Sequence, residues 1–368
     1  MRILFLSDIN SAHTRKWALS LAQRGHQIGI FSLSSLEEDW LSAESGIENL
    51  SESGIPREQL RGSGLKKVTY LKRLTSVKRA IFQFKPDILH AHYATSYGLL
   101  GALSGCHPYI ISVWGSDVFN FPRSSWINKQ ILRFNFRKAD VIMSTSEIMK
   151  NEIQIYTNKP VEVTPFGVDT VLFHPAPSKT NGVKRVGIIK SLEDKYGIDV
   201  LIRAFSLVKQ RYNAPVELYI AGRGSREAEY RGLVRKMGLD GSVHFGGYIP
   251  QAEVPELHRT FDVFVTLSVE DSESFGVSLV ESMASGVPSV VSQVGGLQEV
   301  AEHEVTSYII RPRDEMAAAE AILSLLRDET RAKEMGRNAR ERVIKHYDWK
   351  RNLDHIEEIY KRTLLHFS

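Results

Sequence analysis

The sequence predicts two α/β domains of the doubly wound, parallel-sheet type. Three observations lead to this fold class. Short apolar runs of strand type alternate with amphipathic helical segments along nearly the whole chain. The alternation stops at residues 175–182, which are rich in Pro, Ser, Lys and Gly, and it starts afresh after them. The length of 368 residues suits two domains of ordinary size.

The composition predicts a water-soluble protein in a reducing compartment. The hydrophobic fraction is 42% and the charged fraction 24%, both ordinary values. A single cysteine, Cys106, excludes an internal disulfide framework, and its apolar neighbours favour a small core residue. No signal peptide is visible, and the uncharged residues 90–116 contain enough Gly and Pro to indicate a buried helix, turn and strand. We expect a cytoplasmic protein.

The first half begins with a βαβ unit, which implies a right-handed crossover. We expect a strand, a polar loop, a helix and a second strand, at residues 1–7, 8–15, 17–24 and 27–33. His13 and Arg15 then lie beyond the carboxyl end of the first strand, where α/β proteins bind ligands. The next segment, 34–64, is polar and irregular, and we interpret it as a loop with short helices.

Basic residues are concentrated between positions 59 and 86, where no acid occurs. They are Arg61, Lys66, Lys67, Lys72, Arg73, Lys78, Arg79 and Lys85. A strand at 65–70 and a helix at 71–84 would carry most of them. They fit either a solvated helix face or a contact with anionic lipid or a lipid-pyrophosphate acceptor. No nucleic-acid-binding motif accompanies them, so we expect no nucleic-acid partner.

The remaining elements alternate regularly in both halves. Later strands of the first half are expected at 87–92, 110–113 and 139–146, with a helix at 148–155, and residues 161–165 lead into the passage between the halves. Strands of the second half are expected at 186–189, 216–221, 243–245, 261–267, 289–294 and 308–310. Its helices are expected at 198–211, 254–259, 315–327 and 330–341, and a final helix at 349–365.

The segment 268–299 carries the most specific chemistry. Gly276 begins a helix after a strand, and free amide groups with the positive end of a helix dipole favour a phosphate there. Glu273 lies just before this helix and Glu281 more than one turn inside it. A carboxylate accepts two hydrogen bonds, which suits the vicinal hydroxyls of a sugar. In the alternative interpretation the two acids lie on a solvated face and only complement the positive end of the helix.

Glu273, Phe275, Gly276 and Glu281 together resemble the E-x7-E signature of the large retaining glycosyltransferase family of GT-B fold, group 1 type or family 4. The resemblance implies two Rossmann-like domains facing across a cleft. It places an acceptor-side domain at 1–170, a donor-binding domain at 183–345 and a final helix, 349–368, that crosses back to the first domain. It also implies that Glu273 contacts the donor sugar and that Glu281 holds the ribose.

Further donor contacts follow from the same resemblance. Lys190 and Lys195 stand near the positions of the family's two cations, and they would neutralise the departing diphosphate. The residues implied in donor binding besides Glu281 are Ser274, Phe275, Gly276, Val277, Gly222, Gly247, Tyr248, Gly295 and Gly296. No Asp-x-Asp motif or zinc spacing occurs, so we expect neither a metal nor a cofactor.

The acceptor side departs from the family pattern. Trp114 stands where the family has a histidine near the reaction centre, and tryptophan cannot transfer a proton. Either His92 or Asp117 takes the polar role, or the histidine is dispensable in this branch. The first loop lacks the two glycines common in the family. We therefore assign His13, Arg15 and Trp114 to the acceptor side.

The resemblance implies transfer of a sugar from a UDP- or GDP-sugar to an acceptor hydroxyl. The expected acceptor is a glycan or lipid-linked glycan in bacterial polysaccharide or lipopolysaccharide biosynthesis, with a peripheral contact to the inner membrane surface as an open alternative. A nucleotide-sugar-binding protein without transfer activity is the second hypothesis. A nicotinamide-dependent dehydrogenase is disfavoured because residues 7–13 contain no glycine.

Overall fold

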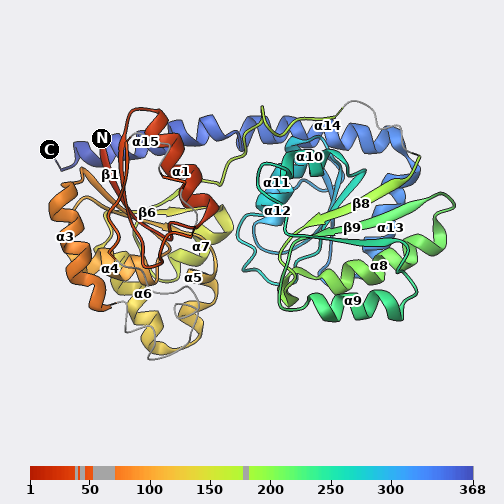
Figure 1. Ribbon diagram of the computed structural model, residues 1–368, viewed down its shortest axis with the longest axis horizontal. Helices are drawn as coiled ribbons and strands as arrows, with labels where there is room; N and C mark the ends of the chain where they lie inside the picture. Colours follow the sequence, from red (N-terminus) through yellow and green to blue (C-terminus); the bar gives the residue numbers. More distant parts are fainter. Residues whose placement is uncertain (38–39, 42–45, 53–70, 177–181, 368) are drawn as a thin grey trace. The chain divides into compact units, whose positions relative to one another are not determined.

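The computed structural model describes residues 1–37, 40–41, 46–52, 71–176 and 182–367. The chain divides into two compact units (Figure 1). The first unit contains Met1–Thr164 and Leu353–Ser368, and the second contains Pro165–Asn352. Each has a parallel sheet with helices on both faces, so the predicted α/β class is confirmed. The expected linker at 175–182 and the strand at 65–70 fall largely or wholly outside the described residues.

The sheet of the first unit has the strand order β3-β2-β1-β4-β5-β6-β7, and all its pairs are parallel. Its strands are β1 Arg2–Leu6, β2 Gln27–Phe31, β3 Ile47–Asn49, β4 Ile88–His92, β5 Tyr109–Val113, β6 Val141–Ser144 and β7 Val161–Val163. The order reverses between β1 and β4. In open α/β sheets, ligands bind beyond the carboxyl ends of the strands at such a reversal.

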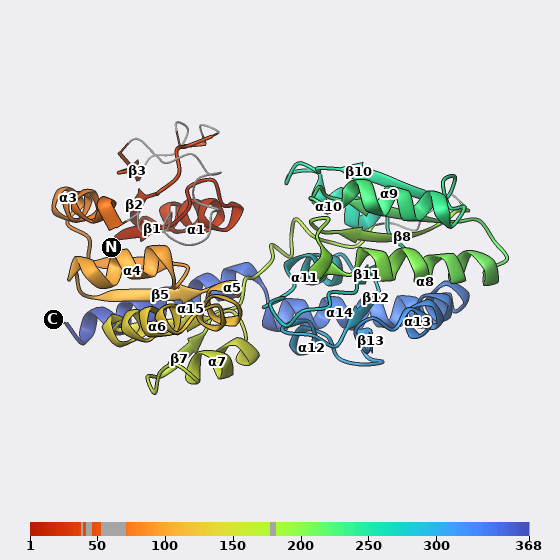
Figure 2. The ribbon, with the colours of Figure 1, turned by 90° about the horizontal axis from the view of Figure 1, so that it is seen from below.

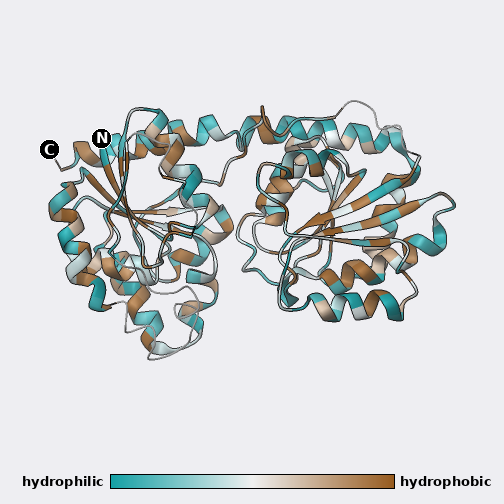
Figure 3. Ribbon diagram, in the orientation of Figure 1, coloured by the Kyte–Doolittle hydropathy of each residue, from teal (hydrophilic) through white to brown (hydrophobic). Residues whose placement is uncertain are grey.

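Helices cover both faces of this sheet (Figure 2). On one face α4 contacts both α3 and α6, and on the other α1 is joined to α15 by ion pairs of Arg24 with Asp354 and Glu357. The helices are α1 Ala12–Gln23, α3 Leu74–Phe84, α4 Ser96–Ser104, α5 Ser116–Phe119, η2 Phe121–Arg123, α6 Trp126–Lys138, α7 Glu147–Gln154 and α15 Trp349–Leu365. Aliphatic and aromatic residues of the strands form the core between the layers (Figure 3).

The sheet of the second unit has the order β10-β9-β8-β11-β12-β13, with parallel pairs and a reversal between β8 and β11. Its strands are β8 Lys184–Ile189, β9 Val216–Ala221, β10 Val243–Gly247, β11 Val263–Thr266, β12 Ser289–Ser292 and β13 Ser307–Ile310. Its helices are η3 Asp194–Tyr196, α8 Ile198–Arg211, α9 Glu227–Lys236, α10 Val254–Arg259, α11 Val277–Ala284, α12 Leu297–Val300, α13 Glu315–Arg327 and α14 Glu329–His346.

Two local expectations are wrong. Residues 8–15 are not all loop, because α1 begins at Ala12 and so includes His13 and Arg15. Ser11 has extended backbone angles, and its carbonyl accepts a hydrogen bond from Arg15 N, which starts the helix. Within 34–64, Ile47–Asn49 form the edge strand β3 rather than a loop or helix, because they pair in register with β2. The rest of that segment is described only in part.

The final helix packs in the first unit through a buried polar contact. Tyr360 of α15 and Ser112 of β5 each place a hydroxyl 2.7 Å from a different ring nitrogen of His90. Burial lowers the pKa of His90 to about 3. Burial also lowers the pKa of His92, and the neighbouring rings of His90 and His13 add to the effect. Both imidazoles are therefore neutral in the folded protein.

We expect the stability of the first unit to fall steadily below pH 6.5. Unfolded histidines titrate near pH 6.5, so between about pH 3 and 6.5 the unfolded chain binds a proton that the native His90 rejects, and the lowered pKa of His92 acts in the same direction. Each such proton lowers the free energy of unfolding by about 1.4 kcal/mol per pH unit. Urea unfolding at several pH values in this range measures how the unfolding free energy changes with pH. This pH dependence should be shallower in His90→Gln, whereas the exposed His303→Gln should leave it unchanged. An unaltered slope in His90→Gln would refute the assignment.

Candidate functional site

Lys190 and Glu273 meet at the strand reversal of the second unit. Lys190 directly follows β8, and Glu273 lies in the loop after β11, the neighbouring strand. Lys190 Nζ is 2.7 Å from Glu273 Oε2, and both side chains are largely buried. Ser268 donates a hydrogen bond of 3.3 Å to the same carboxylate oxygen. Two residues that the sequence selected on separate grounds thus form one charge pair where α/β sheets bind ligands.

Lys195 is connected to this pair through Tyr196. The ammonium groups of Lys190 and Lys195 lie 4.7 and 4.8 Å from the centre of the Tyr196 ring. An aromatic face attracts cations, so the Tyr196 ring contributes to the position of both ammonium groups. Burial raises the pKa of Tyr196, which keeps the phenol neutral. Sequence reasoning missed Tyr196, although it directly follows Lys195.

Helix α11 begins without a side-chain cap. Gly276 occupies the N-cap in a left-handed conformation, φ 86°, and as a glycine it has no side chain that could accept from the first amides of the helix. A Cβ at Gly276 would lie 2.5 Å from Leu297 Cδ2, so a side chain here would also be blocked sterically. Phe275 is buried against Phe166 and Tyr347 and anchors the turn. Val277 is the first helical residue. This helix start keeps amide groups available for an anion.

Glu281 projects from the middle of α11 and has a buried histidine beside it. Its Oε2 is 3.6 Å from Nε2 of His258 on α10, which is beyond hydrogen-bonding distance. The His258 side chain is fully buried among Phe173, Phe261 and Phe264, and both its ring nitrogens lack a hydrogen-bond partner. A buried polar group without a partner is costly and marks a place for water or ligand. Sequence reasoning missed His258 because its contact with α11 is not local.

Gly295 and Gly296 pack directly against the loop that carries Glu273. Gly296 N donates a 2.8 Å hydrogen bond to Glu273 O. A Cβ at Gly295 would lie 2.2 Å from Glu273 O, and one at Gly296 would lie 2.2 Å from the backbone oxygen of Ser274, which is itself buried. The resemblance assigned these glycines to the donor. In the structure they let two backbone segments approach closely, which fixes the position of Glu273.

Gly222 supports Lys190 in the same manner. A Cβ on Gly222 would lie 1.9 Å from Lys190 O, and its φ of 131° is unfavourable for other residues. Gly222 N also donates a 2.6 Å hydrogen bond to the oxygen of Gly247 at the end of β10. Tyr248 follows and is 67% exposed. The glycine turns predicted to contact the nucleotide therefore join the ends of β8, β9 and β10.

Two of the residues assigned to the acceptor side, His13 and Trp114, lie together with His92 in the first unit. The ring of Trp114, after β5, is 4.9 Å from that of His92 at the end of β4 and 5.6 Å from that of His13 on α1. His92 Nδ1 lies 3.1 Å from Ser7 Oγ, after β1. Arg15 is separate from this group, since its guanidinium lies over the Trp40 ring at 5.7 Å. The cluster occupies the carboxyl ends of β1, β4 and β5.

Asp117 holds the loops around this cluster. Its fully buried carboxylate accepts hydrogen bonds from the backbone amides of Ala94, Trp114 and Gly115. Burial raises the pKa of Asp117 to about 6, and these hydrogen bonds oppose the rise. Because the amides occupy its oxygens, the arrangement suits a positioning role. A direct part for Asp117 in catalysis stays a prediction.

No group of three or more His, Cys, Asp or Glu side chains in the described part of the chain could hold a metal ion. The expectation of a metal-independent reaction stays a prediction. Of the helices that the structure describes, none has the length and apolar character needed to cross a bilayer.

Comparison with known proteins gives matches over most of the chain. The family model described as "Glycosyl transferase 4-like" matches residues 2–146, and that described as "Glycosyl transferases group 1" matches residues 173–342. N-acetyl-alpha-D-glucosaminyl L-malate synthase of Bacillus anthracis is 25% identical over 94% of this chain and 91% of its own. A GDP-mannose-dependent alpha-(1-6)-phosphatidylinositol monomannoside mannosyltransferase of Mycobacterium tuberculosis is 29% identical over 51% of this chain and 52% of its own.

Solved structures resemble the whole chain. Sucrose-phosphate synthase from Thermosynechococcus elongatus superposes with a TM-score of 0.84 at 22% identity, covering 100% of both chains. HepE from Anabaena, in complex with UDP, superposes with a TM-score of 0.81 at 19% identity over 98% of this chain and 100% of its own. At these identities the structural likeness shows the fold alone.

Proposed function

This chain belongs to the group 1 glycosyltransferases and has the GT-B fold, and from that premise we propose that it transfers a sugar from a nucleoside-diphosphate sugar to an acceptor hydroxyl with retention of configuration. The observation that carries the proposal is the Lys190–Glu273 pair beside the uncapped start of α11, with Glu281 on the same helix. These groups supply a cation, a carboxylate and free amides within one unit.

The second unit would bind the donor. The first amides of α11 and the ammonium groups of Lys190 and Lys195 match the charge of a pyrophosphate. Glu281, one or two turns further along the helix, would accept hydrogen bonds from the ribose hydroxyls. HepE was solved with UDP, and the mycobacterial relative is named for GDP-mannose, so donors of either nucleotide suit this site.

Lys190 would act mainly in the transition state. Negative charge builds on the β-phosphate as the sugar–oxygen bond breaks, and a preorganised cation stabilises that charge without reorganising water. In the free protein Glu273 keeps this ammonium in place at 2.7 Å. The acceptor hydroxyl would attack from the side of the leaving group, and the departing phosphate would take its proton. The residues of this chain then supply binding and electrostatics rather than a nucleophile.

The first unit would bind the acceptor. His92 is neutral because its pKa is lowered by burial, so it would hydrogen-bond an acceptor hydroxyl without adding charge. The relatives' names differ in acceptor, since one specifies L-malate and the other a phosphatidylinositol mannoside. We favour a glycan or lipid-linked glycan of bacterial polysaccharide or lipopolysaccharide synthesis, because Lys72, Lys78, Arg79 and Lys85 on and beside α3 are exposed cations suited to an anionic lipid.

A nucleotide-sugar-binding protein without transfer activity is the second candidate. Trp114 favours it, since a residue that cannot transfer protons lies in contact with His92. Incubation with labelled UDP- and GDP-sugars and extracted lipid or glycan acceptors separates the two functions. A glycosylated product whose anomeric signal in NMR matches the donor supports a retaining transferase. Tight donor binding with no product, or a product of inverted configuration, would overturn the proposal.

Glu281→Ala should raise the dissociation constant of the donor by about 10- to 100-fold, because each charge-assisted hydrogen bond to the ribose contributes about 1.5–3 kcal/mol. Isothermal titration calorimetry with UDP and GDP measures the effect. The exposed Glu320→Ala, on α13, is the matched control and should bind normally. Normal affinity in Glu281→Ala would remove the ribose assignment without affecting the assignment of the pyrophosphate.

A further inference from the structure

Helix α6 of the first unit exposes one continuous face that the transfer reaction does not use. Trp126, Gln130, Arg133 and Arg137 follow one another at intervals of four, three and four residues, so they share one side of the helix. The opposite side is buried, with Leu132, Asn135 and Phe136 in the core. Ser125 caps the helix by accepting from Asn128 N, which fixes Trp126 as its first residue.

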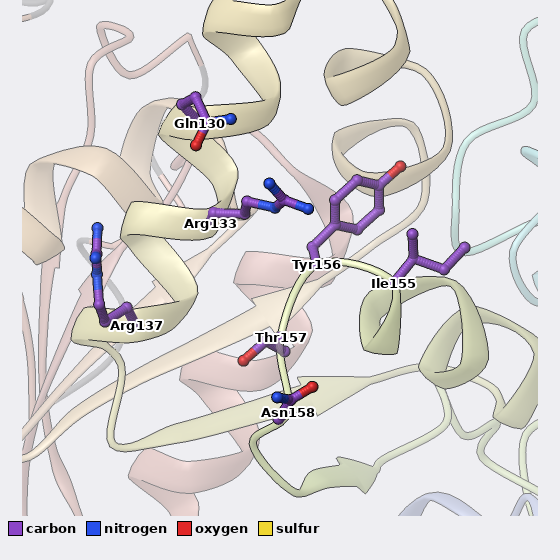
Figure 4. Close-up of a pocket in the computed structure, with 7 residues that line it drawn as sticks. All are labelled: Gln130, Arg133, Arg137, Ile155, Tyr156, Thr157 and Asn158. Carbon is purple, nitrogen blue, oxygen red and sulfur yellow. The ribbon is translucent and has the colours of Figure 1, made fainter.

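An open pocket of about 410 Å³ lies along this face. Figure 4 shows Gln130, Arg133 and Arg137 on α6 opposite the segment that leaves α7, and the side chain of Arg133 extends toward Tyr156. The residues that line the pocket are Gln130, Arg133, Arg137, Ile155, Tyr156, Thr157 and Asn158. Guanidinium, amide and hydroxyl donors therefore surround a space large enough for a phosphate-bearing group.

The charge of this surface is positive. Helix α6 contains Lys129, Arg133, Arg137 and Lys138 and no acid. The nearby carboxylate of Glu152 is already bound by Arg123 at 2.8 Å and by the hydroxyl of Tyr156 at 3.2 Å. Among the described residues, no carboxylate lies within 4.0 Å of the guanidinium of Arg133 or Arg137. The two arginines are thus available to an anionic partner.

Large apolar side chains border the cations. Trp126 is 73% exposed, its neighbour Ile127 63%, and Ile155 at the end of α7 58%. Ile155 lines the same pocket as Gln130, which is one turn from Trp126, so Trp126 and Ile155 lie on the same side as the arginines. Ile127 is rotated by about 100° from Trp126 and flanks this side. Tryptophan beside Arg and Lys is typical of surfaces at the boundary between headgroups and acyl chains.

We propose that this α6 surface docks the protein on an anionic lipid bilayer, with Trp126, Ile127 and Ile155 at the level of the acyl chains and with Arg133 and Arg137 on lipid phosphates. A second copy of the chain is disfavoured as the occupant. A twofold contact would bring two copies of the same positively charged surface together. An anionic bilayer complements both the charge and the exposed apolar groups.

The surface lies outside the basic stretch 61–85, so it adds a second, separately testable contact to the membrane association proposed for a lipid-linked acceptor. The docking proposal depends on the proposed function only for the reason that the protein would need a membrane contact. Its test measures binding to vesicles without any sugar transfer, and transfer to a water-soluble acceptor is measured in parallel. A failure of docking with intact transfer would therefore overturn this inference and leave the proposed function standing.

The test is co-sedimentation of the full chain with phosphatidylcholine vesicles that contain or lack about one quarter phosphatidylglycerol. We expect binding to the anionic vesicles, weakened by salt. Arg133→Gln with Arg137→Gln should lower the partition coefficient about 25-fold, since each basic residue near a membrane contributes about a factor of five. Trp126→Ser with Ile127→Ser should lower it at least about tenfold. All four residues are exposed, and circular dichroism would verify the fold of each variant.

Met316→Ser is the matched control, because Met316 is an exposed apolar residue on α13, away from both α6 and the basic helix α3. It should leave the partition coefficient unchanged. Lipids with brominated acyl chains should quench part of the tryptophan fluorescence of the parent protein. This quenched part should be absent in Trp126→Phe. The proposal would be overturned by an absence of binding to anionic vesicles, by equal binding of the α6 variants and the parent protein, or by loss of binding only in Met316→Ser. A dimer in sedimentation that the α6 substitutions dissociate would instead assign the surface to protein contact and would also overturn it.

Discussion

Lys190→Ala should lower kcat by about 10²–10³-fold while changing the affinity for the donor much less, because its ammonium is needed most where charge develops on the leaving group. The ammonium is placed for this before any substrate binds. The Lys190 ammonium contacts the Glu273 carboxylate and the Tyr196 ring. Gly222, in the turn after β9, packs closely against the backbone oxygen of Lys190. Steady-state kinetics and calorimetry on the same variant separate turnover from binding.

Two variants make this prediction specific. Lys190→Arg retains the charge but not the compact ammonium, so it should recover part of the lost turnover. Lys209→Ala, on α8, removes a cation of the same unit away from the strand reversal and should behave as the parent protein. The prediction fails if Lys190→Ala raises only the dissociation constant of the donor, since Lys190 would then contribute equally to ground state and transition state.

Local sequence patterns predicted most of the fold. The bounds of α8, α10, α13 and α15 follow from apolar spacing and end signals, and the structure has them at the predicted positions. Gly276 was predicted at the start of a helix, and the structure has it at the N-cap of α11 with a positive φ angle. In these cases neighbouring residues alone determine the backbone.

Partners brought together by the fold could not be predicted. The contact of Lys190 with Glu273 joins residues 83 positions apart, and the pairing of β3 with β2 depends on a neighbouring strand rather than on its own short sequence. His258 was missed because a histidine on an amphipathic helix gives no sign of which residue it will face. Helix α6 was not predicted either, because its apolar residues are interrupted by four cations.

Gly295 and Gly296 show that a motif can identify a position without identifying the contacts that the residue makes. The resemblance implies that both glycines bind the donor, and that role stays a prediction. Their immediate neighbours in the structure are backbone atoms of the loop that carries Glu273. Backbone packing of this kind has no signature in the sequence except the absence of a side chain.

Gly296→Ala should therefore lower turnover by about 100-fold, the cost of misplacing a reacting group by about 1 Å. Its φ of −69° suits alanine, so the expected effect is steric. The new methyl group would lie 2.2 Å from Ser274 O and 2.7 Å from Phe275 Cα, and neither backbone atom can move without displacing Glu273. We also expect a loss of about 1–3 kcal/mol in the unfolding free energy of the second unit, as for other overpacked sites.

Gly232→Ala is the matched control for this substitution. Gly232 lies within α9, and a Cβ there would meet nothing within 4 Å. Alanine should stabilise that helix by about 0.5–1 kcal/mol and leave turnover unchanged. Nucleotide affinity should also be retained in Gly232→Ala, because α9 carries none of the residues assigned to the donor. If Gly296→Ala retained full turnover, Glu273 could act from a loop whose position is not fixed by this contact, and the preorganised pair with Lys190 would lose its importance for the reaction.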